Sequence, residues 1–283
     1  MITRHRSENG LEWIRISNEA AEGELYLQGA HLTSWKPMGH EQVIWLSEKS
    51  FYEHGKAIRG GVPLCWPWFG NKDGAQAHGF ARNLVWKFEE HLMPSPSEDV
   101  LKFVLETSEK SIDYWPFRFK LVLSVSIGKL LALSLTSINM DKVPFDLSQA
   151  LHTYFKIGNI GAISIHGLEG CEYLDKTDHA AKKLNEGAFV FTKEEDTVFF
   201  SKSTVVITDP QMNREIHINK SRSSGETVVW NPGPERSKAM ADMADDGYQT
   251  MVCVEAANTG EGGVVLYPGD NFTIYQLISV HHV

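Results

Sequence analysis

The chain has 283 residues, and its 42% hydrophobic and 22% charged content is typical of a folded globular protein rather than a disordered or fibrous one. Its formal net charge of −9 argues against nonspecific nucleic-acid binding, although a local basic pocket can still bind an anion. No run approaches the roughly 18 apolar residues of a membrane span. The polar start has no apolar run behind it, so we expect neither a signal peptide nor a membrane partner.

Short segments rich in β-branched and aromatic residues recur along the chain, and many alternate apolar with polar residues, as half-buried antiparallel strands do. The strands are expected at 11–16, 24–28, 42–46, 84–90, 100–106, 119–127, 130–138, 148–155, 163–168, 204–209, 214–219, 227–231, 251–256 and 272–278. The main helix is expected at 234–246, with Pro234 at its first position and Gly247 at its end. With no linker and no repeat, the sequence predicts one all-β domain over residues 1–283, a large antiparallel β-sandwich with a few short helices.

The stretch from Arg59 to Asn83 is unlike an ordinary strand. It reads R-G-G-V-P-L-C-W-P-W-F-G and then, after a polar loop, A-H-G-F-A-R-N. Prolines cannot donate to a sheet ladder and glycines weaken a strand, so the pattern favours a rigid pocket with aromatic walls. Arg59 and Arg82 add planar donor groups that suit a carboxylate or phosphate. A phosphorylated sugar would need both features.

Two later segments place an ionisable residue in an apolar strand. His152 lies in S-Q-A-L-H-T-Y-F, and a histidine exchanges protons near neutral pH. Glu255 ends the strand M-V-C-V-E, where burial would make an unpaired charge costly. Each also fits a structural role, as a hydrogen-bonded strand histidine and as a solvated carboxylate at a strand end. Together with the arginines, they would supply an acid, a base and an anion site.

Other candidates are open to two interpretations. His78 lies between two loops and fits either a ligand contact or a turn hydrogen bond, and Asp196 fits a solvated charge run. No H-x-H or H-E-x-x-H spacing is present, so the sequence does not predict a metal site. The three cysteines, Cys65, Cys171 and Cys253, lie far apart, which favours a reducing compartment and predicts a cytoplasmic protein.

Five motifs in order resemble the hexose-6-phosphate mutarotases, or glucose-6-phosphate 1-epimerases, within the aldose 1-epimerase group. The motifs are R-G-G-V-P-L-C-W-P-W-F-G, A-H-G-F-A-R-N, Y-W-P-F-R-F, A-L-H-T-Y-F and V-C-V-E-A-A-N, and the similarity covers residues 20–278. The resemblance implies a galactose-mutarotase-like β-supersandwich that interconverts the anomers of a hexose 6-phosphate without a metal or an organic cofactor. The partner would be the phosphorylated hexose alone, and we expect a monomer.

The resemblance also assigns roles to residues. His152 and Glu255 match the catalytic pair, Arg59 and Arg82 match substrate-contacting arginines, and Asp196 matches a substrate-binding aspartate. His78 matches a histidine that lies beside the ring oxygen in related galactose mutarotases. The chain departs from the pattern at two positions: Ala77 precedes His78 where some members have Gln, and Thr197 follows Asp196 where many have Arg.

Mutarotation requires a base at the anomeric hydroxyl and an acid at the ring oxygen, for which we expect Glu255 and His152 respectively. We expect both groups to be charged, each favouring the charge of the other, and a bell-shaped pH profile. Two other classes fit the residues: a noncatalytic carbohydrate-binding β-sandwich, and a metal-dependent sugar isomerase on a β-barrel.

Overall fold

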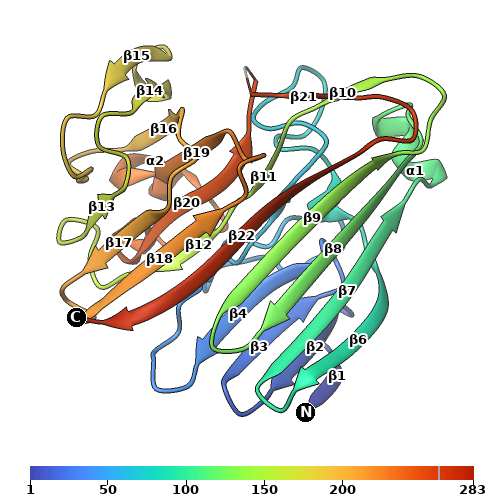
Figure 1. Ribbon diagram of the computed structural model, residues 1–283, viewed down its shortest axis with the longest axis horizontal. Coiled ribbons are helices and arrows are strands. Elements are labelled where there is room, and N and C mark those ends of the chain that lie inside the picture. Colours follow the sequence, from blue (N-terminus) through green and yellow to red (C-terminus); the bar gives the residue numbers. More distant parts are fainter. Residues whose placement is uncertain (261) are drawn as a thin grey trace.

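The computed structural model describes residues 1–260 and 262–283, and nearly all regular structure in them is antiparallel β-sheet. The first eight-stranded sheet has the order β13-β17-β18-β22-β9-β8-β7-β6 (Figure 1). Its strands are β13 Ser164–His166, β17 Val205–Asp209, β18 Arg214–Lys220, β22 Asn271–His282, β9 Leu131–Asn139, β8 Phe119–Ile127, β7 Glu98–Glu106 and β6 Lys87–Ser95. We call it the long-strand sheet.

The second eight-stranded sheet has the order β15-β14-β16-β19-β20-β11-β5, with β12 also paired to β20. Its strands are β15 Ala181–Leu184, β14 Glu172–Asp175, β16 Glu195–Phe199, β19 Glu226–Asn231, β20 Met251–Asn258, β11 Gln149–Leu151, β5 Leu64–Cys65 and β12 Tyr154–Lys156. We call it the site sheet. A four-stranded and a two-stranded sheet complete the fold. They contain β1 Ile2–Arg6, β2 Glu12–Ser17, β3 Ala21–Tyr26, β4 His31–Pro37, β10 Phe145–Leu147 and β21 Val264–Leu266.

The sheets pack on one another through apolar faces and a few buried hydrogen bonds. In β8 and β9 every second residue is buried, as the period-two pattern predicts. In Figure 1 the four-stranded sheet lies behind these strands, and Gly23 of β3 packs against Ile127 of β8. Gln276 of β22 donates to the Val254 carbonyl of β20 at 3.1 Å, which ties the long-strand sheet to the site sheet.

The helices among the described residues are short. The α-helices are α1 Glu109–Tyr114 and α2 Gly233–Ala239, and the 3-10 turns are η1 Ala81–Asn83, η2 Lys176–Asp178 and η3 Gly247–Thr250. None of the helices in this part of the chain is long and apolar enough to cross a bilayer.

Three expectations need correction. The helix expected at 234–246 has Pro234 in its first turn, but it ends at Ala239 because Met240 is extended, and Gly247 begins η3 instead of ending α2. Residues 42–46 form isolated bridges rather than a strand. The strand expected at 148–155 is broken between β11 and β12, and His152 lies in the break.

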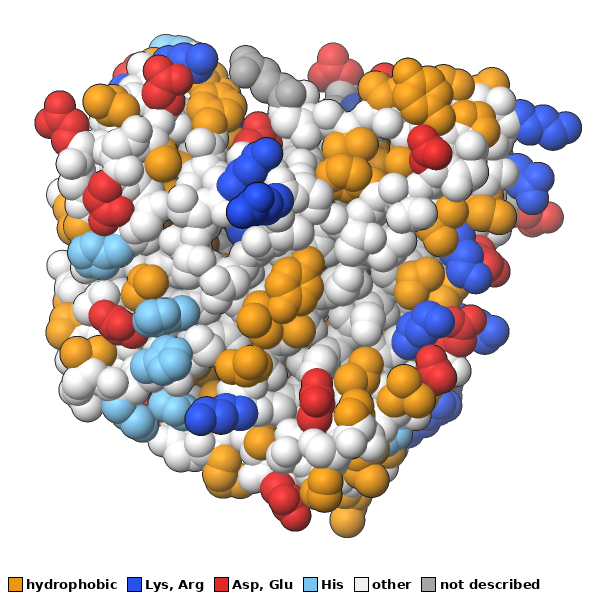
Figure 2. Space-filling model, in the orientation of Figure 1, with side chains coloured by type: hydrophobic (Ala, Val, Ile, Leu, Met, Phe, Trp, Pro, Cys, Tyr) orange, Lys and Arg blue, Asp and Glu red, His pale blue; other side chains and the backbone are white. Residues whose placement is uncertain are grey.

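Several histidines outside the site sheet gather on the surface. Figure 2 shows them on one side of the visible face, near the ends of β18 and β22. The rings of His217 and His281 are 4.6 Å apart, and those of His40 and His282 are 4.3 Å apart. The terminal pair His281 and His282 is exposed, as expected for a solvated chain end.

Candidate active site

A cavity of about 690 Å³ opens at the site sheet, and it is lined by segments from distant parts of the chain. All six residues singled out from the sequence line it, namely Arg59, His78, Arg82, His152, Asp196 and Glu255. Phe69, Tyr154 and Trp230 contribute aromatic surface to the same wall. The volume falls in the range of small-molecule sites, and the mixture of aromatic and charged groups suits a polar ligand with an apolar face.

His152 and Glu255 approach each other at the base of this cavity. Glu255 lies on β20, which is buried along its whole length, and His152 is held by its backbone N–H, which donates to the Pro63 carbonyl at 3.1 Å. His152 Nδ1 is 3.4 Å from Glu255 Oε1. Within the described residues, His152 Nδ1 and Glu255 Oε2 have no hydrogen-bond partner. Buried polar groups are normally paired, so these atoms can take up hydrogen bonds from a polar ligand.

Burial shifts the pKa values of His152 and Glu255 in directions opposite to those expected from the sequence. Burial lowers the pKa of His152 well below its ordinary value, and the charges of Arg82 and Arg59 act in the same direction. Burial raises the pKa of Glu255 well above its ordinary value. The site therefore favours a neutral imidazole beside a protonated carboxyl, rather than the ion pair that we expected. Both forms hold the same number of protons, so moving one proton interconverts them.

His78 faces the His152 ring from the Arg59–Asn83 segment, with the ring centroids 5.6 Å apart. The backbone N–H of Gly70 donates to His78 Nδ1 at 3.3 Å, which places the proton of a neutral ring on Nε2. Burial and the nearby Arg82 lower the pKa of His78 to about 3. The backbone that presents this ring is tightly constrained, because a β-carbon at Gly79 would lie 1.8 Å from the carbonyl oxygen of Trp66.

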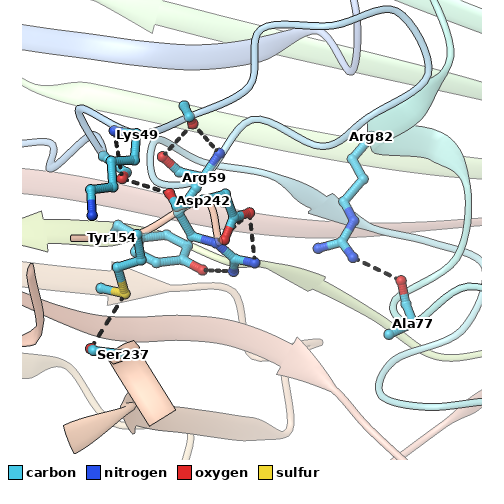
Figure 3. Close-up of polar contacts among 10 residues, drawn as sticks. Lys49, Arg59, Ala77, Arg82, Tyr154, Ser237 and Asp242 are labelled. Carbon is cyan, nitrogen blue, oxygen red and sulfur yellow. Dashed lines mark hydrogen bonds and ion pairs between the residues drawn. The ribbon is translucent and has the colours of Figure 1, made fainter. Parts of the chain in front are cut away.

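The two arginines differ in their partners. Arg59 Nε and Nη2 each lie 3.1 Å from Asp242 Oδ2, and Nη1 donates to the Tyr154 hydroxyl at 3.0 Å. Arg82 Nη2 donates to the Ala77 carbonyl at 2.8 Å. Figure 3 shows the two guanidinium groups apart from each other, with Arg59 between Asp242 and Tyr154.

Arg82 differs from the other cations of the cavity in its charge balance. Lys176 lies 3.6 Å from Asp196, and Arg236 lies 2.9 Å from Glu194. Among the described residues Arg82 has no carboxylate partner, and its Nε has no hydrogen-bond partner. Burial lowers the pKa of Arg82, as expected for a cation removed from water without a counter-charge.

Sequence reasoning missed several groups of the site. Tyr154 stacks on the His152 ring at 4.9 Å with an interplanar angle of 9°. Its position two residues after His152 in the same motif was the available signal. Asp242 lies 183 residues from its partner Arg59, within the segment that we expected to be helical, and no motif marks it. Lys176 had no signal either. In the part of the chain that the structure describes, no three His, Cys, Asp or Glu side chains are grouped as metal ligands.

Comparisons with known proteins identify the family of this chain. Residues 12–279 match the family described as aldose 1-epimerase. The chain is 40% identical over 264 residues to an Escherichia coli protein named "Putative glucose-6-phosphate 1-epimerase", covering 92% of this chain and 87% of that protein. It is 36% identical to the crystal structure of a Salmonella typhimurium protein titled a putative mutarotase, with a TM-score of 0.93 and coverage of 100% and 94%.

A more distant structure bears on the fold alone. A galactose mutarotase-like protein from Clostridium acetobutylicum shares 14% identity with a TM-score of 0.77, covering 100% of this chain and 99% of that one. The predicted all-β, galactose-mutarotase-like fold is therefore confirmed. The chain belongs to the aldose 1-epimerase family.

Proposed function

We propose that this protein is an isomerase that interconverts the α and β anomers of hexose 6-phosphates, with glucose 6-phosphate as the first substrate to test. The observation that carries the proposal is a carboxyl and an imidazole 3.4 Å apart in a cavity that also presents Arg82, whose guanidinium has no carboxylate partner among the described residues. The relatives named for glucose 6-phosphate support the choice of substrate.

In the proposed reaction, Glu255 removes the proton of the anomeric hydroxyl while His152 donates a proton to the ring oxygen. The bond between the ring oxygen and the anomeric carbon breaks, which leaves an open-chain aldehyde. Rotation about the bond between the first and second carbons presents the other face of the carbonyl. The ring then closes with both proton transfers reversed, so the enzyme ends in its starting state.

The proposed reaction begins with a charged Glu255 carboxylate and a charged His152 imidazolium, whereas burial favours the neutral form of both groups. The conversion needs one proton to move from Glu255 to His152 and no exchange with solvent. Sugar hydroxyls that donate to the carboxylate would stabilise its charge, because hydrogen bonds to the charged form of a group favour that form. We therefore propose that substrate binding itself promotes the reactive protonation state.

The remaining groups would bind and orient the sugar. We assign the phosphate to Arg82, since a partly buried guanidinium without a carboxylate partner among the described residues gains most from an anion and can hold two phosphate oxygens. Arg59, already neutralised by Asp242, would donate to the substrate with its remaining N–H groups. His78 would donate from Nε2 toward the ring oxygen, and Asp196 would accept from sugar hydroxyls.

The test is an anomer-resolved NMR or polarimetric assay of the purified protein on glucose 6-phosphate, galactose 6-phosphate and free glucose. We expect the equilibration rate of the phosphorylated sugars to rise in proportion to enzyme concentration and to survive chelation. Binding without acceleration would instead indicate a carbohydrate-binding module. Activity that chelation abolishes would indicate a metal-dependent isomerase.

A further inference from the structure

Lys176 is a cavity residue to which neither the motifs nor the resemblance assigned a role. It begins the three-residue turn η2, directly after β14, and lines the same cavity as the catalytic candidates. Its Nζ lies 3.6 Å from Asp196 Oδ1 and 4.7 Å from the centre of the Phe69 ring. The ammonium therefore has a carboxylate on one side and an aromatic face of the cavity wall on another.

The turn that carries Lys176 is held by a buried carboxylate. Asp175 is 2% exposed, and its Oδ1 accepts hydrogen bonds from Thr177 N at 2.9 Å and Thr177 Oγ1 at 2.6 Å. Its Oδ2 accepts from Lys183 Nζ at 2.8 Å. Burial raises the pKa of Asp175, but these hydrogen bonds outweigh burial and lower it to about 2, so the carboxylate stays charged. The backbone of Lys176 is thus fixed.

Glu255 is surrounded by charged or titratable groups from several elements. They are His152 between β11 and β12, Lys176 on η2, Asp196 on β16, Arg82 on η1, Cys65 on β5, Cys253 on β20 and Glu226 on β19. Asp196 disfavours the charge of Glu255, while Lys176 and Arg82 favour it. Two carboxylates in one site disfavour each other's charge unless a cation lies beside them, and here Glu255 is 1% exposed whereas the Asp196 side chain is 23% exposed and lies beside Lys176.

We propose that Lys176 is a positioning residue that neutralises Asp196 and thereby allows Glu255 to carry the negative charge that the reaction requires. The inference rests on the proposed function for its catalytic meaning. The effect of Lys176 on the pKa of Glu255 concerns only the ligand-free protein and can be measured without substrate.

The first experiment is an NMR titration of the Glu255 side-chain carboxyl carbon in the wild type and in Lys176→Met. We expect Lys176→Met to move the titration upward by on the order of 1 pH unit, because an attractive charge has been removed. Lys176→Arg should restore it. The matched control is Lys182→Met, which removes the same charge from exposed β15 outside the cavity and should change nothing.

A second variant tests the sign. Asp196→Asn removes the repulsive neighbour and should move the Glu255 titration downward in the ligand-free protein. If Lys176→Met and Lys182→Met gave the same titration while both remained folded by circular dichroism, the proposal would be wrong. Should Lys176→Met fail to fold, Asp196→Asn alone tests the proposal. A Glu255 titration that stays unchanged or moves upward in that variant would contradict it.

The kinetic consequence follows only if the wild type is a mutarotase. In the free enzyme the active pair holds a protonated Glu255 and a neutral His152, so loss of the Glu255 proton to solvent forms the basic limb of the pH profile of kcat/KM, and a raised Glu255 pKa moves that limb toward higher pH. We expect that shift in Lys176→Met and recovery in Lys176→Arg. An inactive wild type would refute the proposed function and leave the titration result intact, whereas an active enzyme with an unmoved limb would refute the role of Lys176.

Discussion

The central strands of the two eight-stranded sheets bury polar side chains to different extents. In β8 and β9 of the long-strand sheet, buried residues alternate with partly exposed ones, and the buried ones are apolar except for Ser137 and Asn139, both of which are hydrogen-bonded. In β19 and β20 of the site sheet every residue is buried, including Glu226, Asn231, Glu255 and Asn258. Burying a polar group costs free energy unless it is hydrogen-bonded. The regular sheet therefore serves the core, and the other sheet accepts less favourable residues where the ligand would bind.

Within the site sheet, the buried polar groups themselves divide into two kinds. Asn231 Nδ2 donates to the Tyr248 carbonyl at 2.8 Å and to the Met251 carbonyl at 2.9 Å, and Glu226 accepts a hydrogen bond from the backbone of Thr259. In the described part of the chain, Glu255 Oε2 has no such partner. Hydrogen-bonded groups of the first kind stabilise the fold, whereas Glu255, which lines the cavity, keeps an oxygen that a ligand can hydrogen-bond. Four substitutions or titrations can break or sharpen this division.

The largest effect is expected at Glu255. Replacing it with Gln removes the base but leaves the shape, so kcat for glucose 6-phosphate should fall by about 10²-fold to 10⁴-fold. The free energy of unfolding should stay equal or rise, because a buried ionisable group has been removed. Anomer-resolved kinetics and denaturant unfolding measure both. Near-normal mutarotation by this variant would remove Glu255 from the mechanism.

The converse is expected in the long-strand sheet. Leu133 of β9 is 1% exposed, so Leu133→Ala should cost roughly 2 to 5 kcal/mol in the free energy of unfolding. KM for glucose 6-phosphate should be unchanged in the folded fraction. Ser134→Ala, on the outer face of the same strand, is the control and should change stability by less than about 0.5 kcal/mol. A KM effect without a stability loss would contradict the division between the sheets.

Acid should lower the free energy of unfolding through His31, which supports the Arg59–Asn83 segment. His31 of β4 is 0% exposed, its Nε2 donates to the Gly60 carbonyl at 2.8 Å, and burial lowers its pKa to about 4. Below its unfolded pKa of about 6.5 the unfolded chain binds a proton that the folded chain does not. This histidine should therefore cost about 3 kcal/mol of stability as the pH falls from 6.5 through 4.

Denaturant unfolding across that pH range measures the loss, with His31→Gln as the comparison. The variant should have a shallower dependence between pH 6.5 and 4, even if it is less stable at pH 7. Equal slopes in the two proteins would show that His31 does not contribute to the acid response. β8 and β9 contain no histidine, so they add no such response of their own.

The smallest effect is expected at Arg82. Charge-assisted hydrogen bonds contribute roughly 1.5 to 3 kcal/mol, so Arg82→Ala should raise KM for glucose 6-phosphate by roughly 10-fold to 100-fold. KM for free glucose should change much less, and Arg82→Lys should be intermediate because it keeps the charge without the planar fork. Equal changes for both sugars would reassign Arg82 to the ring hydroxyls.

The strands β8, β9, β17 and β18 of the long-strand sheet were predictable because each buries one face, which leaves a period of two in the sequence. Residues 42–46 look the same in sequence, yet Ile44 and Leu46 form only single bridges to Phe155 and Gly60. β6 buries no residue, and it runs from Lys87 to Ser95 where a strand at 84–90 was expected. In the site sheet, the family resemblance paired His152 with Glu255, and the structure brings the two side chains to 3.4 Å from each other. The partners of the arginines were not predictable, because ion pairs such as Arg59 with Asp242 depend on long-range packing that no local pattern records.

The close approach of Gly79 to Trp66 limits how this pocket can be redesigned. A saturation library at position 79 should return glycine alone, because a methyl group there would overlap the main chain of Trp66. Libraries aimed at new sugars would do better at the rim, where Asn71 is exposed and Ala77 is partly exposed to the cavity. For transplantation into another scaffold, residues 59–83 act as one module whose two halves must be moved together.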